Sequence, residues 1–549
     1  MRLDEVELNG RLPPEQRRLL TRLIAEFMSQ RRTVAPPQDP LVQLGAAELA
    51  RRIARREVTS SAVVEAHLRR IEQVNPQINA IVLPRFEAAR QEAEAADRAV
   101  AVGQPLGPLH GVPITVKECF HVPGMPSTIG LTNRIGLLDT DENVLVARLR
   151  AAGAVLLGKT NVPQLMVWHE SDNPVYGRTN SPLDLDRSAG GSSGGEAAAI
   201  AAYCSPLGLG NDLGGSIRVP ASWNGLFGFK PTSFRLSNVG TTGAFRGLLV
   251  MVTQGGPLAR NVEDCELTFK ILVGDHSGID VAPVPLRDSQ QVAIGGMKLA
   301  AWDDDGYFPA CASARRAVQE AARALEEQGA NVEWLKPARI AEIMELYYSI
   351  IGSDGGRDAR RMVVGSKVDH RVARMLWMAG MPRTARWGIV QALLMAGQKW
   401  QASLVSVARA RTAAEFWELC ERLGDLVSVF QDEVFVQRGI QAILSPPHAV
   451  PAIPHNTGFE LLPAASYAYH ANLLGLPAGV VPWTTVRVDE TRTSSVARDI
   501  AVRRAEEALI GAAGLPIGVQ IAAPRWREDI VLAVMRALEN AAPTKLSSP

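Results

Sequence analysis

The chain has 549 residues, of which 46% are hydrophobic and 21% charged, and its formal net charge is +1. This composition excludes a disordered chain and a surface that is basic overall, so we expect a folded protein that binds no nucleic acid. The start, "MRLDEVELNGRLPPEQRR", lacks the apolar core of a signal peptide, and no run of 18 apolar residues follows. We therefore expect a cytoplasmic protein without a transmembrane helix.

The cysteines and histidines indicate neither a disulfide framework nor a metal site. The five cysteines are scattered without a Cys-x-x-Cys pair, and an odd number cannot all be bridged within one chain. The nine histidines form no His-x-x-x-His cluster, so a zinc site would need ligands from distant segments. We expect reduced cysteines and no metal.

The N-terminal part of the chain is predicted to be helical. Residues 1–43 contain the helix candidate "EQRRLLTRLIAEFMSQ", followed by "TVAPPQDPLVQ", whose prolines cannot continue a helix. This segment is predicted to be a helical extension of the main body. From Leu44 to about Val102 the pattern remains helical, because Val64, Leu68 and Ile71 recur at i, i+4 and i+7.

Strand and helix patterns alternate from there to Glu539. "HGVPITVKECF" predicts a strand ending near Lys117, "ENVLVARLRAAG" a helix ending before Gly153, and "AVLLG" a buried strand. "EAAAIAAYC" predicts a helix, and "SPLGLGNDLGGSIRVPAS" a loop region interrupted by glycines. The alternation favours the α/β class, with a mixed sheet covered by helices on both faces.

One segment, residues 370–414, differs in charge from the rest. It holds seven Arg or Lys and no Asp or Glu, together with Trp377, Trp387, Trp400 and four methionines. Ile389, Leu393, Trp400 and Leu404 keep helical spacing along it. Two interpretations remain open: an ordinary amphipathic helix pair over the core, or a basic, Trp-bearing helix pair that rests on a membrane surface.

Gly153 to Thr160 match the phosphate-binding pattern Gly-x4-Gly-Lys-Thr letter for letter. A phosphate-binding loop, however, follows a strand and opens a helix. Here a helix precedes Gly153, the intervening residues are apolar and strand-forming, and Pro163 follows closely. The pattern therefore favours a buried strand after a helix cap.

The stretch "RSAGGSSGGE" matches Gly-x-Ser-x-Gly twice, once centred on Ser192 and once on Ser193. A nucleophile elbow needs an apolar strand leading directly into the motif, whereas the preceding "NSPLDLDRSA" is polar and typical of a loop. Downstream histidines exist at 448, 455 and 470, but nothing around them singles one out. These features argue against an α/β-hydrolase.

A serine–lysine site fits the same residues better. A lysine acts as a base when burial keeps it neutral, and Lys117 ends a hydrophobic strand. Successive backbone N–H groups in a glycine-rich turn suit an oxyanion site, and "NDLGGSIR", residues 211–218, supplies such a turn with Ser216 near its end.

Several motifs together resemble the amidase signature family. They are "HGVPITVKE", "GGSSGG", "NDLGGSIRVPA", "GLFGFKPT" and "GLPIGVQIAAP", which occur in the family's order between Leu44 and Glu539. "VKECF", "NVPQLM", "SDGGR" and "LPAGVVPWTTV" are similar to the fatty-acid amide hydrolase branch in particular. The resemblance implies the amidase-signature fold: one domain over 44–540, with core motifs at 110–235, a helical cap and membrane-contact insert at 340–420, and the C-terminal part of the sheet at 440–540.

The resemblance also implies a Ser-Ser-Lys triad that needs no cofactor. Ser216 would be the nucleophile, Ser192 the bridging serine on a cis peptide, and Lys117 the base. The backbone N–H groups of Leu213, Gly214, Gly215 and Ser216 would form the oxyanion hole. Ser193, Asp212 and Arg218 would support this geometry.

The implied activity is hydrolysis of amides through an acyl-enzyme, with long-chain fatty-acid amides as the first expectation. Substrate contacts are expected from Met166, Ser192, Leu213, Trp483 and Thr484. Two departures from the family pattern stand out: Asn211 where Thr is usual, and Trp483 where a smaller residue is usual, which is expected to narrow the acyl channel.

Alternatives left open are an amidase or esterase for aryl, short-chain or synthetic amides and carbamates, and a glutamine-hydrolysing amidotransferase subunit. The resemblance further implies a homodimer, peripheral on a membrane through residues 370–414.

Overall fold

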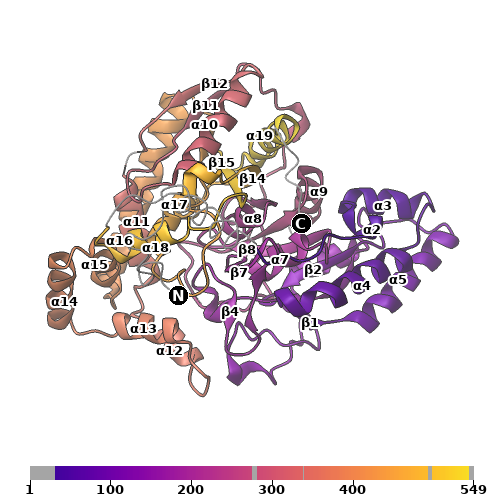
Figure 1. Cartoon of the computed structure of the whole chain (residues 1–549), viewed down its shortest axis with the longest axis horizontal. Helices are drawn as coiled ribbons and strands as arrows, with labels where there is room; N and C mark the ends of the chain where they lie inside the picture. The colour runs from indigo at the N-terminus through magenta and orange to yellow at the C-terminus, as the bar shows by residue number, and fades with distance from the viewer. Residues whose placement is uncertain (1–30, 246, 275–280, 338, 492–496, 543–549) are drawn as a thin grey trace, which may run out of the picture.

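An eleven-stranded mixed sheet organises the part of the chain that the structure describes (Figure 1). The computed structural model describes residues 31–245, 247–274, 281–337, 339–491 and 497–542. The predicted helix "EQRRLLTRLIAEFMSQ" lies outside these ranges. The α/β class with one large mixed sheet is confirmed.

The sheet is parallel in two places and antiparallel elsewhere. Parallel pairs join β3, β2 and β8 near one edge and β13, β11 and β12 at the other. In spatial order the strands are β1 (Ile81–Pro84), β3 (Val155–Thr160), β2 (Pro113–Lys117), β8 (Leu207–Asp212), β10 (Gln254–Ala259), β9 (Phe227–Lys230), β14 (Ala478–Thr485), β15 (Pro516–Ala522), β13 (Ala442–Ser445), β11 (Lys298–Ala301) and β12 (Asn331–Trp334).

Helices cover both faces of the sheet, as two adjacent residues of β14 demonstrate. Side chains alternate between the faces of a strand. Val480 pairs with Gly228, so these two residues face the same side of the sheet. A Cβ added to Gly228 would meet Ala221 on helix α8 (Arg218–Trp223). At the next residue, Gly479, a Cβ would meet Met535 on α19 (Glu528–Ala541). The two helices therefore lie on opposite faces, and small residues let them approach the strands closely.

The segment from residue 44 to 102 consists of three helices and one short strand. Helices α3 (Ala46–Ala54), α4 (Ser60–Ile78) and α5 (Phe86–Ala101) confirm most of the prediction, and the Thr59 hydroxyl caps α4 by accepting from the Ala62 N–H. The prediction misses β1, a four-residue edge strand. Asn79, with φ 48°, turns the chain out of α4 so that residues 81–84 can pair with β3.

The helix and strands predicted around the glycine motifs are mostly confirmed. Helix α6 (Val144–Ala151) precedes β3, so Lys159 lies in a strand and not in a phosphate loop. Helix α7 (Gly194–Ala201) contains the predicted alanine-rich run. Two loop predictions are wrong. β8 is a central strand, and residues 184–188 form β7 (Asp184–Ser188), which pairs with β6 (Asn180–Ser181) outside the main sheet.

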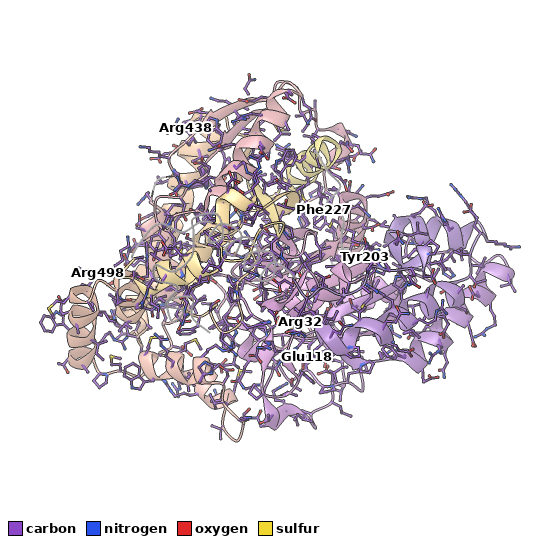
Figure 2. All side chains as sticks on the ribbon, viewed as in Figure 1. Arg32, Glu118, Tyr203, Phe227, Arg438 and Arg498 are labelled. Atoms are coloured by element: carbon purple, nitrogen blue, oxygen red, sulfur yellow. The ribbon has the colours of Figure 1, made fainter. Side chains whose placement is uncertain are left out.

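Residues 340–430 form a layer of helices at the left and lower left of Figure 1, which we call the cap. The predicted helix pair in 370–414 is three short helices, because turns near Gly380 and Gly397 break it. The cap contains α11 (Ile340–Ile351), α12 (Arg357–Met362), α13 (His370–Ala379), α14 (Arg383–Met395), α15 (Lys399–Val407) and α16 (Ala413–Phe430). The carbonyl of Arg498, labelled beside the cap in Figure 2, accepts a hydrogen bond from Gln398 Nε2 at 2.7 Å.

The three tryptophans of the cap have different environments. Trp377 on α13 is 60% exposed and Trp387 on α14 is 70% exposed, whereas Trp400 on α15 is 5% exposed and packs on Tyr307 and Phe308. Trp400 therefore belongs to the core and not to an external face. None of the helices within the described ranges has the length and apolar character needed to cross a bilayer.

Candidate active site

Lys117 and Asn211 lie side by side because β2 and β8 are parallel neighbours that end at the same edge. Val116 pairs with Leu209, so the residues that follow on each strand face one another. Lys117 Nζ donates to Asn211 Oδ1 at 2.6 Å and lies 2.7 Å from Ser192 Oγ. Glu118, labelled in Figure 2, points elsewhere: its carboxylate accepts the backbone N–H groups of Thr128 and Ile129.

Ser192 reaches Lys117 from the loop that leads into α7. The peptide bond between Gly191 and Ser192 is cis, and Gly190 has φ +87°, a conformation that favours glycine. A Cβ on Gly191 would meet the backbone of Trp168 and Glu170. The glycines of this loop thus allow the close approach that brings the Ser192 hydroxyl to the amine.

Burial makes Lys117 suitable as a base. The side chain is completely buried, and desolvation lowers the pKa of Lys117 to about 8, against smaller opposing effects of Cys119, Asp212 and Glu196. A neutral amine has two N–H groups and one lone pair. Asn211 accepts both N–H groups of the amine, one at Oδ1 and the other at its backbone oxygen, 3.4 Å away. The lone pair of the Lys117 nitrogen is then free to accept the Ser192 hydroxyl.

Ser216 sits on a loop that a buried ion pair holds in place. Arg218 donates to both carboxylate oxygens of Asp212 at 3.0 Å, and both side chains are fully buried. Burial alone would raise the pKa of Asp212, but the Arg218 guanidinium outweighs burial and holds it well below its usual range. Asp212 also accepts the N–H of Gly215 at 2.7 Å.

That last contact changes the predicted oxyanion hole. The Gly215 N–H points to Asp212 Oδ1, so it is not directed at a substrate in this structure. The N–H groups of Leu213, Gly214 and Ser216 remain as the candidates. Gly214 is held from its carbonyl side, because His169 Nε2 lies 2.9 Å from the Gly214 oxygen. Burial lowers the pKa of His169 to about 4, so the ring is neutral and its N–H can donate.

Two cavities meet at Ser216, and both are also lined by Met166 and Leu213. The first, which we call the cap cavity, has a volume of about 160 Å³ and extends under α11, α12, α13 and α15, past Tyr347 and Tyr469. The second, which we call the loop cavity, has a volume of about 240 Å³ and is lined largely by residues 238–253. Of these two, only the loop cavity includes Ser192 and Asn211 in its wall.

The structure brings the three triad candidates and Met166 together, but not two of the predicted substrate contacts. Trp483 is 2% exposed in the core, and the Thr484 hydroxyl accepts from Arg316 at 3.0 Å. Neither residue lines the cap cavity or the loop cavity. Trp483 therefore does not narrow the acyl channel, because the end of β14 packs against α10 (Ala312–Glu326) instead of the site.

Ser193 is hydrogen-bonded to two neighbouring segments of the site. Its N–H donates to the Ser216 carbonyl at 3.2 Å and its hydroxyl to the Asn211 carbonyl at 3.3 Å. The sequence reasoning missed the aromatic support of the loop. The rings of Tyr347 and Tyr469 stack at 4.3 Å, and the Tyr347 hydroxyl donates to the Leu213 carbonyl at 3.3 Å. Nothing in the local sequence pattern marks these two tyrosines, since they join the loop only through tertiary packing.

Comparison with known proteins gives a consistent result. A family model described as Amidase matches residues 62–532. The chain is 32% identical to fatty-acid amide hydrolase 1 of Sus scrofa over 91% of its own length and 86% of that protein. It is 30% identical to fatty acid amide hydrolase 1 of Caenorhabditis elegans over 92% and 89%. Its similarity to a glutamyl-tRNA(Gln) amidotransferase chain of Acidothermus cellulolyticus, at 37% identity, covers 57% of this chain and 62% of that one.

Solved structures of two amide-cleaving enzymes have a similar fold. A structure of fatty acid amide hydrolase superposes with a TM-score of 0.80 at 26% identity, covering 94% of this chain and 88% of that one. A bacterial aryl acylamidase superposes with a TM-score of 0.71 at 26% identity, covering 92% and 98%.

Proposed function

Because the chain belongs to the amidase family and is an amidohydrolase, we propose that it cleaves carboxylic amides through an acyl-enzyme formed on Ser216. The observation that supports the site is the position of Ser192, 2.7 Å from the buried amine of Lys117 and in the same cavity wall as Ser216. A base that reaches one serine, beside a second serine on a glycine-rich turn, is the arrangement that serine activation without histidine requires.

The mechanism begins with neutral Lys117. Its lone pair accepts the proton of Ser192, and Ser192 accepts the proton of Ser216 as Ser216 Oγ attacks the amide carbonyl. The carbonyl oxygen becomes an oxyanion, which the N–H groups of Leu213, Gly214 and Ser216 stabilise. Loss of one such donor typically costs about 3 kcal/mol of transition-state stabilisation.

The same protons then return to the leaving group. An amide nitrogen leaves poorly without a proton, so Ser192 donates one to the amine as the C–N bond breaks, and Lys117 re-protonates Ser192. Since Ser192 lines the loop cavity and not the cap cavity, the amine half of the substrate occupies the loop cavity. The acyl half occupies the cap cavity. Water then enters, and the relay repeats on the acyl-enzyme.

Long-chain fatty-acid amides are the favoured substrates. The similarity to fatty-acid amide hydrolase 1 of Sus scrofa covers 91% of the chain, whereas the similarity to the amidotransferase chain covers 57% of it. The cap cavity is walled mostly by apolar side chains, including Leu376, Met378 and Leu404. A volume of about 160 Å³ is close to that of cavities that hold benzene, about 150 Å³. A long acyl chain therefore extends beyond it, toward the surface beside the exposed Asp354.

We further propose that the cap rests on a membrane. Trp377 and Trp387 project from neighbouring helices of a segment that carries seven basic and no acidic residues. Two of the basic side chains, Arg371 and Arg386, are buried, whereas Arg374, Arg383 and Lys399 are exposed. Indole rings beside cations suit the interface of an anionic bilayer. A peripheral position there would deliver lipid-like amides to the cap cavity. The cytoplasmic location is a prediction from the N-terminal sequence, and the homodimer is a prediction from the family resemblance. Sedimentation velocity would test the dimer.

Two measurements test the assignment together. A series of amides with one amine and acyl chains of 4 to about 18 carbons should give kcat/KM values that rise with length. A flat or falling series beyond about six carbons would contradict the fatty-acid assignment and favour the aryl or short-chain alternative. A fluorophosphonate probe should label Ser216 in a peptide map, and labelling of Ser192 or Ser193 in its place would overturn the triad.

A further inference from the structure

His121 links Asp141 to Thr242 in a hydrogen-bonded chain beside the active site. His121 Nδ1 lies 3.0 Å from Asp141 Oδ1, and His121 Nε2 lies 2.9 Å from Thr242 Oγ1. The mechanism uses none of these three residues. The other carboxylate near the ring, Asp139, lies 4.0 Å from Nε2 and binds Lys159 at 2.9 Å instead.

Backbone contacts fix this chain relative to the triad. After β2 the chain makes a turn at residues 118–119. Beyond the turn, the His121 N–H donates to the Gly240 carbonyl at 2.9 Å, and the Thr242 N–H donates to the Cys119 carbonyl at 2.9 Å. Cys119 in turn accepts from Asn211 Nδ2 at 3.3 Å. Two backbone hydrogen bonds therefore hold residues 119–121 against residues 240–242, and this pair of segments begins two residues after Lys117.

The protonation states in this chain follow from its chemistry. The His121 hydrogen bond lowers the pKa of Asp141, which keeps its carboxyl group ionised and able only to accept. His121 Nδ1 must then carry the hydrogen. When the imidazole is neutral, Nε2 has only a lone pair, so in that form the Thr242 hydroxyl donates to it. The Thr242 oxygen is left with lone pairs alone.

Thr242 lines the loop cavity together with Ser192 and Asn211. This cavity holds the amine half of the substrate, by the proton argument above. A hydroxyl oxygen that can only accept attracts a donor group on the amine and gains nothing from an alkyl group. It also repels an ether oxygen, since two acceptors then face each other without a hydrogen between them.

Resting on the proposed amide hydrolysis, we propose that Thr242, held by Asp141 and His121, selects amides whose amine half carries a hydrogen-bond donor such as a hydroxyl or amide N–H. Thr242 contacts the substrate and determines specificity, whereas His121 and Asp141 are positioning residues. The selection acts on the leaving group and is independent of the acyl chain in the cap cavity.

Three substrates with one acyl chain and different amine halves test this. The N-(2-hydroxyethyl) amide has a donor, the N-(2-methoxyethyl) amide has only an acceptor, and the N-propyl amide has neither. At pH 8 the parent should hydrolyse the hydroxyethyl amide with a kcat/KM about tenfold above that of the propyl amide, and the methoxyethyl amide no faster than the propyl amide. Thr242→Val, which keeps the shape, should bring the hydroxyethyl-to-propyl ratio to about one.

Asp141→Asn gives a readout that a structural role would not. Asn can donate to His121 Nδ1, which moves the ring hydrogen to Nε2, so that Nε2 donates to Thr242 and the Thr242 hydrogen turns to the cavity. The methoxyethyl-to-propyl ratio should then rise above one. Asp141 is largely exposed, with a side chain 59% accessible, so the substitution should leave the melting temperature within about 2 °C of the parent value.

The neighbouring Thr241→Val is the matched control for selectivity: Thr241 lines the same loop cavity, but its hydroxyl accepts from Asn143 Nδ2 and lies outside the His121 chain. Its ratios should equal those of the parent. Equal kcat/KM for the three amides in the parent, or an equal loss of selectivity in Thr241→Val, would overturn the assignment of Thr242. A parent that cleaves none of the three would instead overturn the proposed function.

Discussion

Lys117 Nζ and Asn211 Oδ1 lie 2.6 Å apart at the adjoining ends of β2 and β8, which makes Asn211 the residue that directs the lysine lone pair toward Ser192. Asn211→Leu removes the acceptor but keeps the volume. We expect kcat to fall at least tenfold with KM little changed, because the amine then samples orientations that do not face Ser192. Asn211→Thr, which restores an acceptor oxygen, should retain most of the activity. Equal activity of the Leu and Thr variants would contradict a positioning role.

The pH dependence of the rate should report the base. The pKa of Lys117 is lowered to about 8 by burial, and the amine acts only when it is neutral. The value of kcat/KM should therefore rise with pH, with a midpoint near 8, and level off above it. Lys117→Ala should lose the rising limb along with about 10²- to 10⁴-fold in rate. A midpoint near 6.5 in the parent would indicate a histidine base.

Gly214 is the point at which the oxyanion loop meets the stacked tyrosines. A Cβ at this position would collide with the Tyr347 hydroxyl and the Tyr469 ring. Gly214→Ala should lower kcat about 10²-fold, because the displaced loop no longer aims its N–H groups at the oxyanion, while far-ultraviolet circular dichroism remains unchanged. Adding Tyr347→Phe removes the nearest obstacle and should recover part of the loss. No gain from the second substitution would exclude this clash as the cause.

Membrane binding should depend on the exposed tryptophans of the cap. Trp377→Ala with Trp387→Ala should reduce co-sedimentation with anionic lipid vesicles several-fold, because both rings project from the basic segment. Trp334→Ala on β12 is the matched control, since Trp334 is 48% exposed and lies outside the cap. If the double variant, the control and the parent co-sediment equally with the vesicles, the cap is excluded as the contact surface.

The sequence predicted those parts of the site that depend on local pattern. Lys117 at the end of an apolar strand, the glycine turn before Ser216 and the helix after Ser193 were all predicted in their correct structural settings. β8 was predicted as a loop because its glycines have low strand propensity. Those glycines are needed because α7 and β10 press on the strand: a Cβ on Gly210 would meet Ser193 and Leu258.

Features that depend on distant segments were not predictable. The three groups that hold the turn before Ser216 come from residues 169, 347 and 469, and no periodic pattern connects them. The location of Trp483 was mispredicted for the same reason. Whether a residue at the end of β14 faces the site or α10 depends on the register irregularity between Pro482 and Thr484, which the sequence pattern does not show.

The two cavities that meet at Ser216 also set the order of events in the proposed mechanism. There the acyl group stays in the cap cavity while the amine occupies the loop cavity, so the amine must depart before water can reach the ester from the same side. The loop cavity thus serves the first product and the second reactant in turn. Any small nucleophile that fits there competes with water for the acyl group. Hydroxylamine added to the reaction should therefore divert a fraction of each turnover into the hydroxamic acid, because it attacks the acyl-enzyme in place of water.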